Sequence, residues 1–175
     1  SWSFTAHARD IYHESVDRDA LRRKLADADC TITVSRFNAD YLERELGAPR
    51  NRLQLVYNGI DLAALPCAEA TPPEREPLLL GVGRLIEKKG FADLVSACAR
   101  LRERGVAFRC EIAGSGPLEA ALREQIAALQ LADRVQLLGA LTQAETLERM
   151  RRATLVAAPC VVAEDGDRDG RGHRR

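Results

Sequence analysis

Apolar runs of five or six residues alternate with helix-periodic stretches through the second half of the chain. The run at 78–83 is continuously apolar, which is typical of a parallel strand covered on both faces. A loop of charged residues and glycine follows, and apolar residues then recur at helical spacing from Phe91 to Leu101. Gly105 stands where a glycine would end that helix. This stretch therefore predicts a strand, a loop and a helix.

The same order recurs further along the chain. A glycine turn at 114–116 precedes Pro117, a residue favoured in the first turn of a helix. Thr142 and Glu145 have the spacing of a capping box and predict the start of another helix. The predicted strands lie at 78–83, 108–113, 135–138 and 155–160. Strands that alternate with helices in this way predict a Rossmann-like α/β fold, a parallel sheet with helices on both faces.

The first part of the chain alternates in the same manner and predicts a second, shorter α/β unit. Strands are expected at 2–5 and 31–34, a helix at 19–26, and a further helix that Ser35 caps and Gly47 ends. Turn residues and four prolines separate the two units. We therefore predict a partial first domain at 1–57, a linker at 58–77, a partial second domain at 78–170 and a tail at 171–175.

Composition excludes several classes of protein. Lys plus Arg equals Asp plus Glu at 26 each, so no net field would draw the chain to nucleic acid or to an anionic membrane. Five cysteines without a CxxC pair predict reduced thiols in a cytosol, and neither a disulfide framework nor a zinc site. The longest apolar stretch, 155–163, is broken by Pro159 and is far shorter than the ~20 residues of a spanning helix. The opening residues look like a strand already under way and not like a signal peptide.

Arg84 and Lys89 lie in a loop of small and charged residues, 81–90, directly after the first strand of the second domain. Open α/β sheets bind ligands at the carboxyl ends of their strands. Arg84 can offer a fork of donors to a diphosphate, Lys89 a point charge, and the next helix a partial positive charge at its N-terminus. Together they would stabilise a departing nucleoside diphosphate. Taken alone, such a loop is more often a solvated charge run, here made of Arg84, Lys88 and Lys89.

Two other positions are candidates for the same site. Gly114 opens a second glycine turn, which can bring backbone close to a ligand or can simply turn the chain. His7 follows the predicted first strand, within reach of a cleft between domains, although a single histidine is more often structural. A dinucleotide fingerprint would need glycine in place of Ile86, and the Walker pattern is absent.

Six stretches, taken in order, resemble a known family. They are FTAHARDI at 4–11, TVS at 33–35, VYNGID at 56–61, GVGRLIEKKG at 81–90, AGSGP at 113–117 and DRVQLLG at 133–139. In this order they are similar to the family 4 retaining glycosyltransferases of the GT-B fold, especially bacterial members that build exopolysaccharide or lipid-linked glycans. The resemblance runs from residue 4 to about residue 170.

The resemblance implies two Rossmann-like domains that face each other across a cleft, with a nucleotide-sugar donor held mainly by the second. Residues matching Arg84 and Lys89 would hold the donor diphosphate. Backbone near Gly83, Gly114 and Leu141 would cradle the nucleotide. The chemistry implied by the family requires neither a metal ion nor a cofactor.

Catalytic roles are implied for two further residues. His7 matches a histidine beside the donor sugar, and Asp169 matches an acidic residue that touches the same sugar. A Glu that holds the ribose should follow roughly two helical turns later, but the sequence continues only with RGHRR. We therefore expect the chain to be a segment of a longer parent, truncated at both ends, whose last residues reflect a shifted reading frame or an assembly break.

The expected function of the parent is transfer of a sugar from a UDP- or GDP-sugar to a glycan or lipid-linked acceptor, with retention. One alternative is a catalytically inert nucleotide-sugar-binding remnant. Another is a structural α/β domain whose loops are charged only for solubility. No nucleic-acid partner is expected. A cytoplasmic location is expected, and the resemblance is compatible with peripheral association of the parent at the inner face of the membrane.

Overall fold

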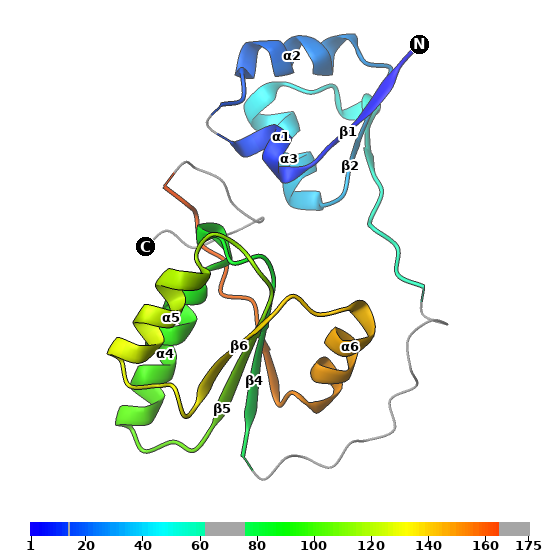
Figure 1. Cartoon of the computed structure of the whole chain (residues 1–175). Helices are drawn as coiled ribbons and strands as arrows, with labels where there is room; N and C mark the ends of the chain where they lie inside the picture. The colour runs from blue at the N-terminus through cyan, green and yellow to red at the C-terminus, as the bar shows by residue number, and fades with distance from the viewer. Residues whose placement is uncertain (14, 62–75, 165–175) are drawn as a thin grey trace. The chain divides into compact units, whose positions relative to one another are not determined.

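The structure is a computed structural model that describes residues 1–13, 15–61 and 76–164 (Figure 1). The chain divides into two units, each built on its own parallel sheet. Residues 1–61 and the stretch from Val161 onward form the first unit, and Leu62–Cys160 form the second. The predicted boundaries at residues 57, 77 and 170 stay predictions, and the tail at 171–175 lies outside the described residues.

The first unit contains a three-stranded parallel sheet in the order β1-β2-β3. Its elements are β1 (Ser3–Ala6), α1 (Ala8–Tyr12), α2 (Arg18–Asp27), β2 (Cys30–Thr33), α3 (Arg36–Leu46), the 3₁₀ turn η1 (Arg50–Arg52) and β3 (Leu53–Leu55). Apolar side chains of α2 and α3 form the core with Ala6; they include Leu21, Leu25, Leu42 and Leu46. Burial of each such leucine contributes about 1.5–3 kcal/mol, so the core holds the two helices against the sheet.

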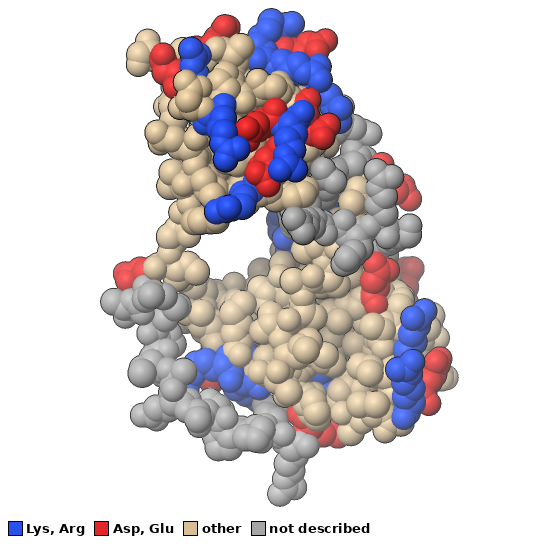
Figure 2. All heavy atoms as spheres, turned by 180° about the vertical axis from the view of Figure 1, so that it is seen from behind, with Lys and Arg blue, Asp and Glu red and all other residues tan. Residues whose placement is uncertain are grey.

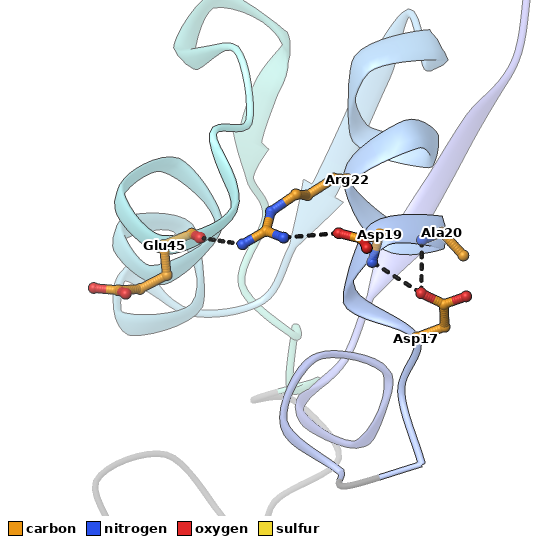
Figure 3. Close-up of polar contacts among 5 residues, drawn as sticks. All are labelled: Asp17, Asp19, Ala20, Arg22 and Glu45. Atoms are coloured by element: carbon orange, nitrogen blue, oxygen red, sulfur yellow. Dashed lines mark hydrogen bonds and ion pairs between the residues drawn. The ribbon is translucent and has the colours of Figure 1, made fainter.

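A carboxylate fixes the start of α2, and an arginine joins α2 to α3 (Figure 3). Asp17 accepts hydrogen bonds from the backbone N–H groups of Ala20 at 3.0 Å and Asp19 at 2.9 Å, and these bonds lower the pKa of Asp17. Arg22 donates to the Asp19 carboxylate at 2.9 Å and to the Glu45 carbonyl oxygen at 3.4 Å. The last turn of α3 thus gains a donor for one of its unpaired carbonyl groups.

The second unit contains a four-stranded parallel sheet in the order β6-β5-β4-β7. Its elements are β4 (Leu78–Val82), the 3₁₀ turn η3 (Glu87–Lys89), α4 (Phe91–Glu103), β5 (Arg109–Ala113), α5 (Glu119–Ala128), β6 (Val135–Gly139), α6 (Gln143–Arg152) and β7 (Leu155–Ala157). Helices α4 and α5 lie together on one face of the sheet and α6 lies on the other (Figure 1). This is the predicted Rossmann-like α/β fold, with β4 inside the sheet and helices on both faces.

The core of the second unit lies between the sheet and helices α4 and α5. Phe91, Val95, Phe108, Ile112, Leu122 and Leu131 are among its buried members. Two cysteines also lie there, Cys98 on α4 and Cys110 on β5, and both are buried. The hydrogen bond between the two thiols, together with burial, raises the pKa of Cys110. Both thiols are therefore buried, and their reduced state stays a prediction.

Several predicted helix ends are confirmed. Ser35 caps α3 by accepting a hydrogen bond from the backbone N–H of Asn38 at 3.1 Å, and Gly47 ends the helix in the left-handed region at φ 72°. Gly105, at φ 71°, follows the last turn of α4. Thr142 caps α6 within the predicted capping box. Local side-chain chemistry therefore determines these ends, as the sequence pattern indicates.

Other predictions were wrong in detail. Helix α5 begins at Glu119 and not at Pro117; the two residues before it form a turn, in which the backbone N–H of Leu118 donates to the Leu85 carbonyl oxygen at 3.1 Å. Strand β7 ends at Ala157 instead of residue 160; Pro159, which lacks an N–H for the ladder, follows two residues later. The short helix α1 was not predicted at all.

Charges of both signs alternate on the surface of the first unit. In the view of Figure 2, Lys and Arg side chains there are interspersed with Asp and Glu, and neither sign forms a continuous patch. The face of the second unit in the same view is largely uncharged (Figure 2). In the described part of the chain, no helix has the length and hydrophobicity that a membrane span requires.

Candidate functional site

A pocket of about 240 Å³ lies at the carboxyl ends of β4, β5 and β6. This is the edge at which parallel α/β sheets bind ligands. Its lining comes from three consecutive strand ends and from α6: Val82, Gly83, Arg84, Ala113, Gly114, Ser115, Ala140, Leu141 and Thr146. Four residues predicted to belong to the site, Gly83, Arg84, Gly114 and Leu141, are thus brought together in one pocket.

The first two glycine loops are held together by backbone hydrogen bonds. The N–H of Gly83 donates to the Ala113 carbonyl oxygen at 2.9 Å, and the N–H of Gly114 donates to that of Gly139 at 2.7 Å. A Cβ atom at Gly114 would lie 1.8 Å from the Gly83 carbonyl oxygen. Gly114, at φ 144°, also has a backbone conformation that L residues rarely adopt. Glycine is therefore required where the two loops meet.

The same interlocking continues one residue further and determines where Arg84 lies. Leu85, fully buried, donates its N–H to the Ser115 carbonyl oxygen at 2.9 Å. A Cβ atom at Gly116 would lie 2.5 Å from the Leu85 carbonyl oxygen. With its two neighbours in the chain fixed in this way, Arg84 is left exposed on the rim of the pocket. A guanidinium group there is free to meet a ligand that enters from solvent.

Lys89 reaches back to the same loop. It ends η3, and Gly90, at φ 66°, then turns the chain into α4. A Cβ atom at Gly83 would lie 3.5 Å from Lys89 Cδ and 3.6 Å from Cε, so the ammonium group one bond further lies near Gly83. Lys89 is not a lining residue of the pocket, but its side chain lies against Gly83, the residue before Arg84. The N-terminus of α4 begins beside them and adds a partial positive charge.

The opposite wall of the pocket comes from the loop after β6 and the first turns of α6. Thr142 and Glu145 form the capping box, in which the Glu145 carboxylate accepts from the Thr142 N–H at 2.8 Å. This backbone hydrogen bond, assisted by the Thr142 hydroxyl, lowers the pKa of Glu145. Thr146 lines the pocket, and its hydroxyl donates to the Thr142 carbonyl oxygen at 2.8 Å.

Thr146 was missed in the sequence, although a signal was present. It lies four residues after the cap Thr142, so both side chains lie on one face of α6. A helix that starts at a ligand-binding strand end presents its first turns to the ligand. The cap position alone therefore could have indicated Thr146.

The structure describes one of the two predicted catalytic residues. His7 is exposed and directly follows β1 in the first unit, as predicted, and its backbone N–H donates to the Asp10 carboxylate at 3.1 Å. Asp169 lies outside the described residues. The catalytic roles of both residues stay predictions.

Both halves of the chain match models of sugar-transferring enzymes. Residues 68–166 match the family described as glycosyl transferases group 1, and residues 3–64 match that described as glycosyltransferase family 4. The amylovoran biosynthesis glycosyltransferase AmsK of Erwinia amylovora is 32% identical over 125 residues, covering 71% of this chain and 31% of that protein. The 2-deoxystreptamine glucosyltransferase of Streptomyces kanamyceticus is 30% identical over 162 residues, 87% of this chain and 41% of that protein. The chain thus spans well under half the length of these relatives.

Solved structures share the fold at lower sequence identity. Sucrose-phosphate synthase from Thermosynechococcus elongatus superposes with a TM-score of 0.73 at 22% identity, covering 91% of this chain and 44% of that one. Anabaena Alr3699/HepE, solved in complex with UDP, gives a TM-score of 0.71 at 19% identity, with 92% and 47% covered. The resemblance noted in the sequence is confirmed, and because the group 1 model covers more than half of its 175 residues, the chain belongs to the glycosyl transferases of group 1.

Proposed function

We propose that the parent protein transfers a sugar from a UDP- or GDP-sugar to a glycan or lipid-linked acceptor, and that the second unit of this chain holds the donor. The observation that carries the proposal is the pocket in which Gly83, Arg84, Gly114 and Leu141 converge. The name of AmsK supports a role in exopolysaccharide synthesis. The UDP in the Anabaena HepE structure supports a uridine nucleotide as the first ligand to test.

The pocket is suited to part of a nucleotide. Its volume of about 240 Å³ is below the roughly 300 Å³ at which pockets for whole drug-sized ligands begin. Backbone of the two glycine loops and Leu141 would surround the nucleoside, while the diphosphate extends toward Arg84 and Lys89. Each charge-assisted hydrogen bond to the diphosphate would contribute about 1.5–3 kcal/mol. Positive charge at this loop therefore determines the affinity for the diphosphate in this proposal.

The same cations would favour the reaction itself. Cleavage of the bond between sugar and diphosphate places negative charge on the diphosphate as positive charge grows on the sugar. Arg84 and Lys89, fixed before the reaction, interact more strongly with the leaving group as that charge appears. We propose that the transfer needs no metal ion for this reason. We further propose that it proceeds with retention on the leaving-group face, with His7 and Asp169 beside the donor sugar.

A second candidate is an inert fragment that binds the donor without turnover. The observation that favours it is coverage, since the chain spans 31% of AmsK and 41% of the Streptomyces glucosyltransferase. The acceptor, the cytoplasmic location and the membrane contact of the parent stay predictions in either case.

Calorimetric titration with UDP and with GDP tests the donor site. We expect one of the two nucleotides to bind the wild-type chain, and the double variant Arg84→Ala, Lys89→Ala to lose at least tenfold in affinity. The matched control is Arg123→Ala, an exposed arginine of α5 that pairs with Glu119 on the surface. Failure of a folded chain to bind either nucleotide would contradict the donor-site assignment.

Incubation with radiolabelled nucleotide-sugar then separates the two candidates. Release of labelled sugar by the purified chain, abolished in the double variant, would exclude the inert fragment. Binding without any release of sugar would support the inert fragment and would leave transfer to the longer parent.

A further inference from the structure

One buried carboxylate lies on β5, two residues before the pocket residue Ala113. Glu111 belongs to β5, in which the neighbouring Cys110 and Ile112 point into the core formed with α4 and α5. Because side chains alternate along a strand, Glu111 points to the opposite face of the sheet, where α6 packs. The Glu111 side chain is only 10% exposed, so its charge needs a partner.

That partner comes from α6. Arg149 donates to the Glu111 carboxylate at 2.6 Å, and the Arg149 side chain is itself two-thirds buried. The remaining attachments of α6 lie at its ends, where the Thr142 cap precedes the helix and the Thr154 N–H donates to the Leu78 carbonyl oxygen at 2.9 Å. No residue of α6 is fully buried. The ion pair thus ties the middle of α6 to the sheet.

The ion pair is also close to the pocket on both elements. Thr146, a pocket residue, precedes Arg149 by three positions, so the two side chains share one face of α6 about 4.5 Å apart along the helix axis. Ala113, also a pocket residue, follows Glu111 by two positions and shares its face of β5. Any shift of α6 on the sheet would therefore move one wall of the pocket relative to the other.

We propose that Glu111 and Arg149 are a positioning pair that holds α6 in the place where Thr146 and the Ala140–Leu141 backbone form the wall of the nucleotide pocket. The inference deepens the proposed function and rests on it for the identity of the ligand. The pair acts through α6 and does not contact the diphosphate. Loss of the pair should weaken binding of the nucleoside. Loss of Arg84 should weaken only the binding of the diphosphate.

The test is Arg149→Met, which keeps an unbranched apolar stem and removes the guanidinium group with its charge. The control is Arg151→Met, because Arg151 has a similarly exposed side chain but pairs with Glu148 of the same helix, at 3.1 Å. We expect Arg149→Met to lower the affinities for UDP and for UMP by the same factor, about tenfold. In Arg149→Lys, at least half of that loss, on a logarithmic scale, should be restored. Arg151→Met should change neither affinity by more than twofold. Equal affinities for Arg149→Met and the wild-type chain would overturn the proposal.

Amide hydrogen exchange of the free chain gives a second readout that needs no ligand. Backbone amides of α6 should exchange at least tenfold faster in Arg149→Met than in Arg151→Met, while amides of β4 and α4 keep the wild-type rates. Unchanged exchange in α6 would overturn the positioning role. Accelerated exchange throughout the second unit would overturn it too, because the pair would then stabilise the fold as a whole. Should the wild-type chain bind no nucleotide, the proposed function fails, and exchange still decides whether the pair positions α6.

Discussion

Replacing Gly114 with alanine should unfold the junction between the two glycine loops. The new Cβ atom would lie 1.8 Å from the Gly83 carbonyl oxygen, whereas real Cβ contacts are essentially never shorter than 3.0 Å. The loops must therefore move apart by more than an ångström. Two hydrogen bonds of 2.9 Å tie them, from the Gly83 N–H to the Ala113 carbonyl oxygen and from the Leu85 N–H to the Ser115 carbonyl oxygen, and a movement of that size breaks both.

The magnitude follows from these contacts. Two hydrogen bonds contribute about 0.5–1.5 kcal/mol each. Holding alanine at φ 144° adds about 1–3 kcal/mol of backbone strain. We expect Gly114→Ala to lower the free energy of unfolding of the second unit by about 4 kcal/mol, within the usual total of about 5–15 kcal/mol for a domain.

Gly105→Ala is the matched control, because Gly105 has a left-handed φ of 71° and no atom within 4 Å of its added Cβ. That variant should lose only about 1–2 kcal/mol, the cost of the left-handed backbone. Amide exchange of the most protected residues of β5 measures the unfolding free energy of the second unit in both variants. Values within 1 kcal/mol of each other would refute the idea that close approach of the two loops requires glycine.

Two further predictions follow from pKa shifts. Glu145 should titrate below its ordinary value of 4.5, and Thr142→Ala should bring it back toward that value in a carbon-detected NMR titration. Because the pKa of Glu145 is lowered in the folded state, the capping box stabilises α6 above pH 4.5. This stabilisation is lost as the pH falls through the folded pKa. An unshifted pKa of Glu145 would contradict the prediction. Cys98 and Cys110 should resist iodoacetamide at pH 8 until urea unfolds the second unit, since both side chains are buried out of reach of the reagent and the pKa of Cys110 is raised, whereas the partly exposed Cys30 should react in the folded chain. Labelling of all three at one rate in the folded state would contradict the buried pair.

Much of the fold could be predicted because each signal is local. The continuous apolar run before Gly83 and the helical spacing after it need no knowledge of the rest of the chain. The capping box of Thr142 and the glycine at the end of α4 are equally local. The turn at Pro117 is less local, because it lies against the first glycine loop, where the Leu118 N–H donates to the Leu85 carbonyl oxygen, 33 positions away.

The candidate site was only partly predictable for the same reason. Arg84 and Gly114 could be identified because both follow strands whose carboxyl ends meet at one edge of the sheet. The pairing of Glu111 with Arg149 depends on how α6 crosses the sheet, and neither residue has a local signal beyond a charge within an apolar strand. The sequence of a parallel strand also does not indicate whether the strand lies at the edge or in the middle of the sheet. The exposure of Leu155, on the edge strand β7, therefore could not be predicted.

The affinity of the chain for nucleoside diphosphate relative to monophosphate tests the central claim most directly. If Arg84 and Lys89 bind the second phosphate, calorimetry should show UDP binding at least tenfold more tightly than UMP, or GDP more tightly than GMP. Each tenfold corresponds to about 1.4 kcal/mol. The double variant Arg84→Ala, Lys89→Ala should then bind both forms equally, at the monophosphate affinity of the wild-type chain. The claim would be contradicted if the double variant lost affinity for the monophosphate and for the diphosphate by the same factor.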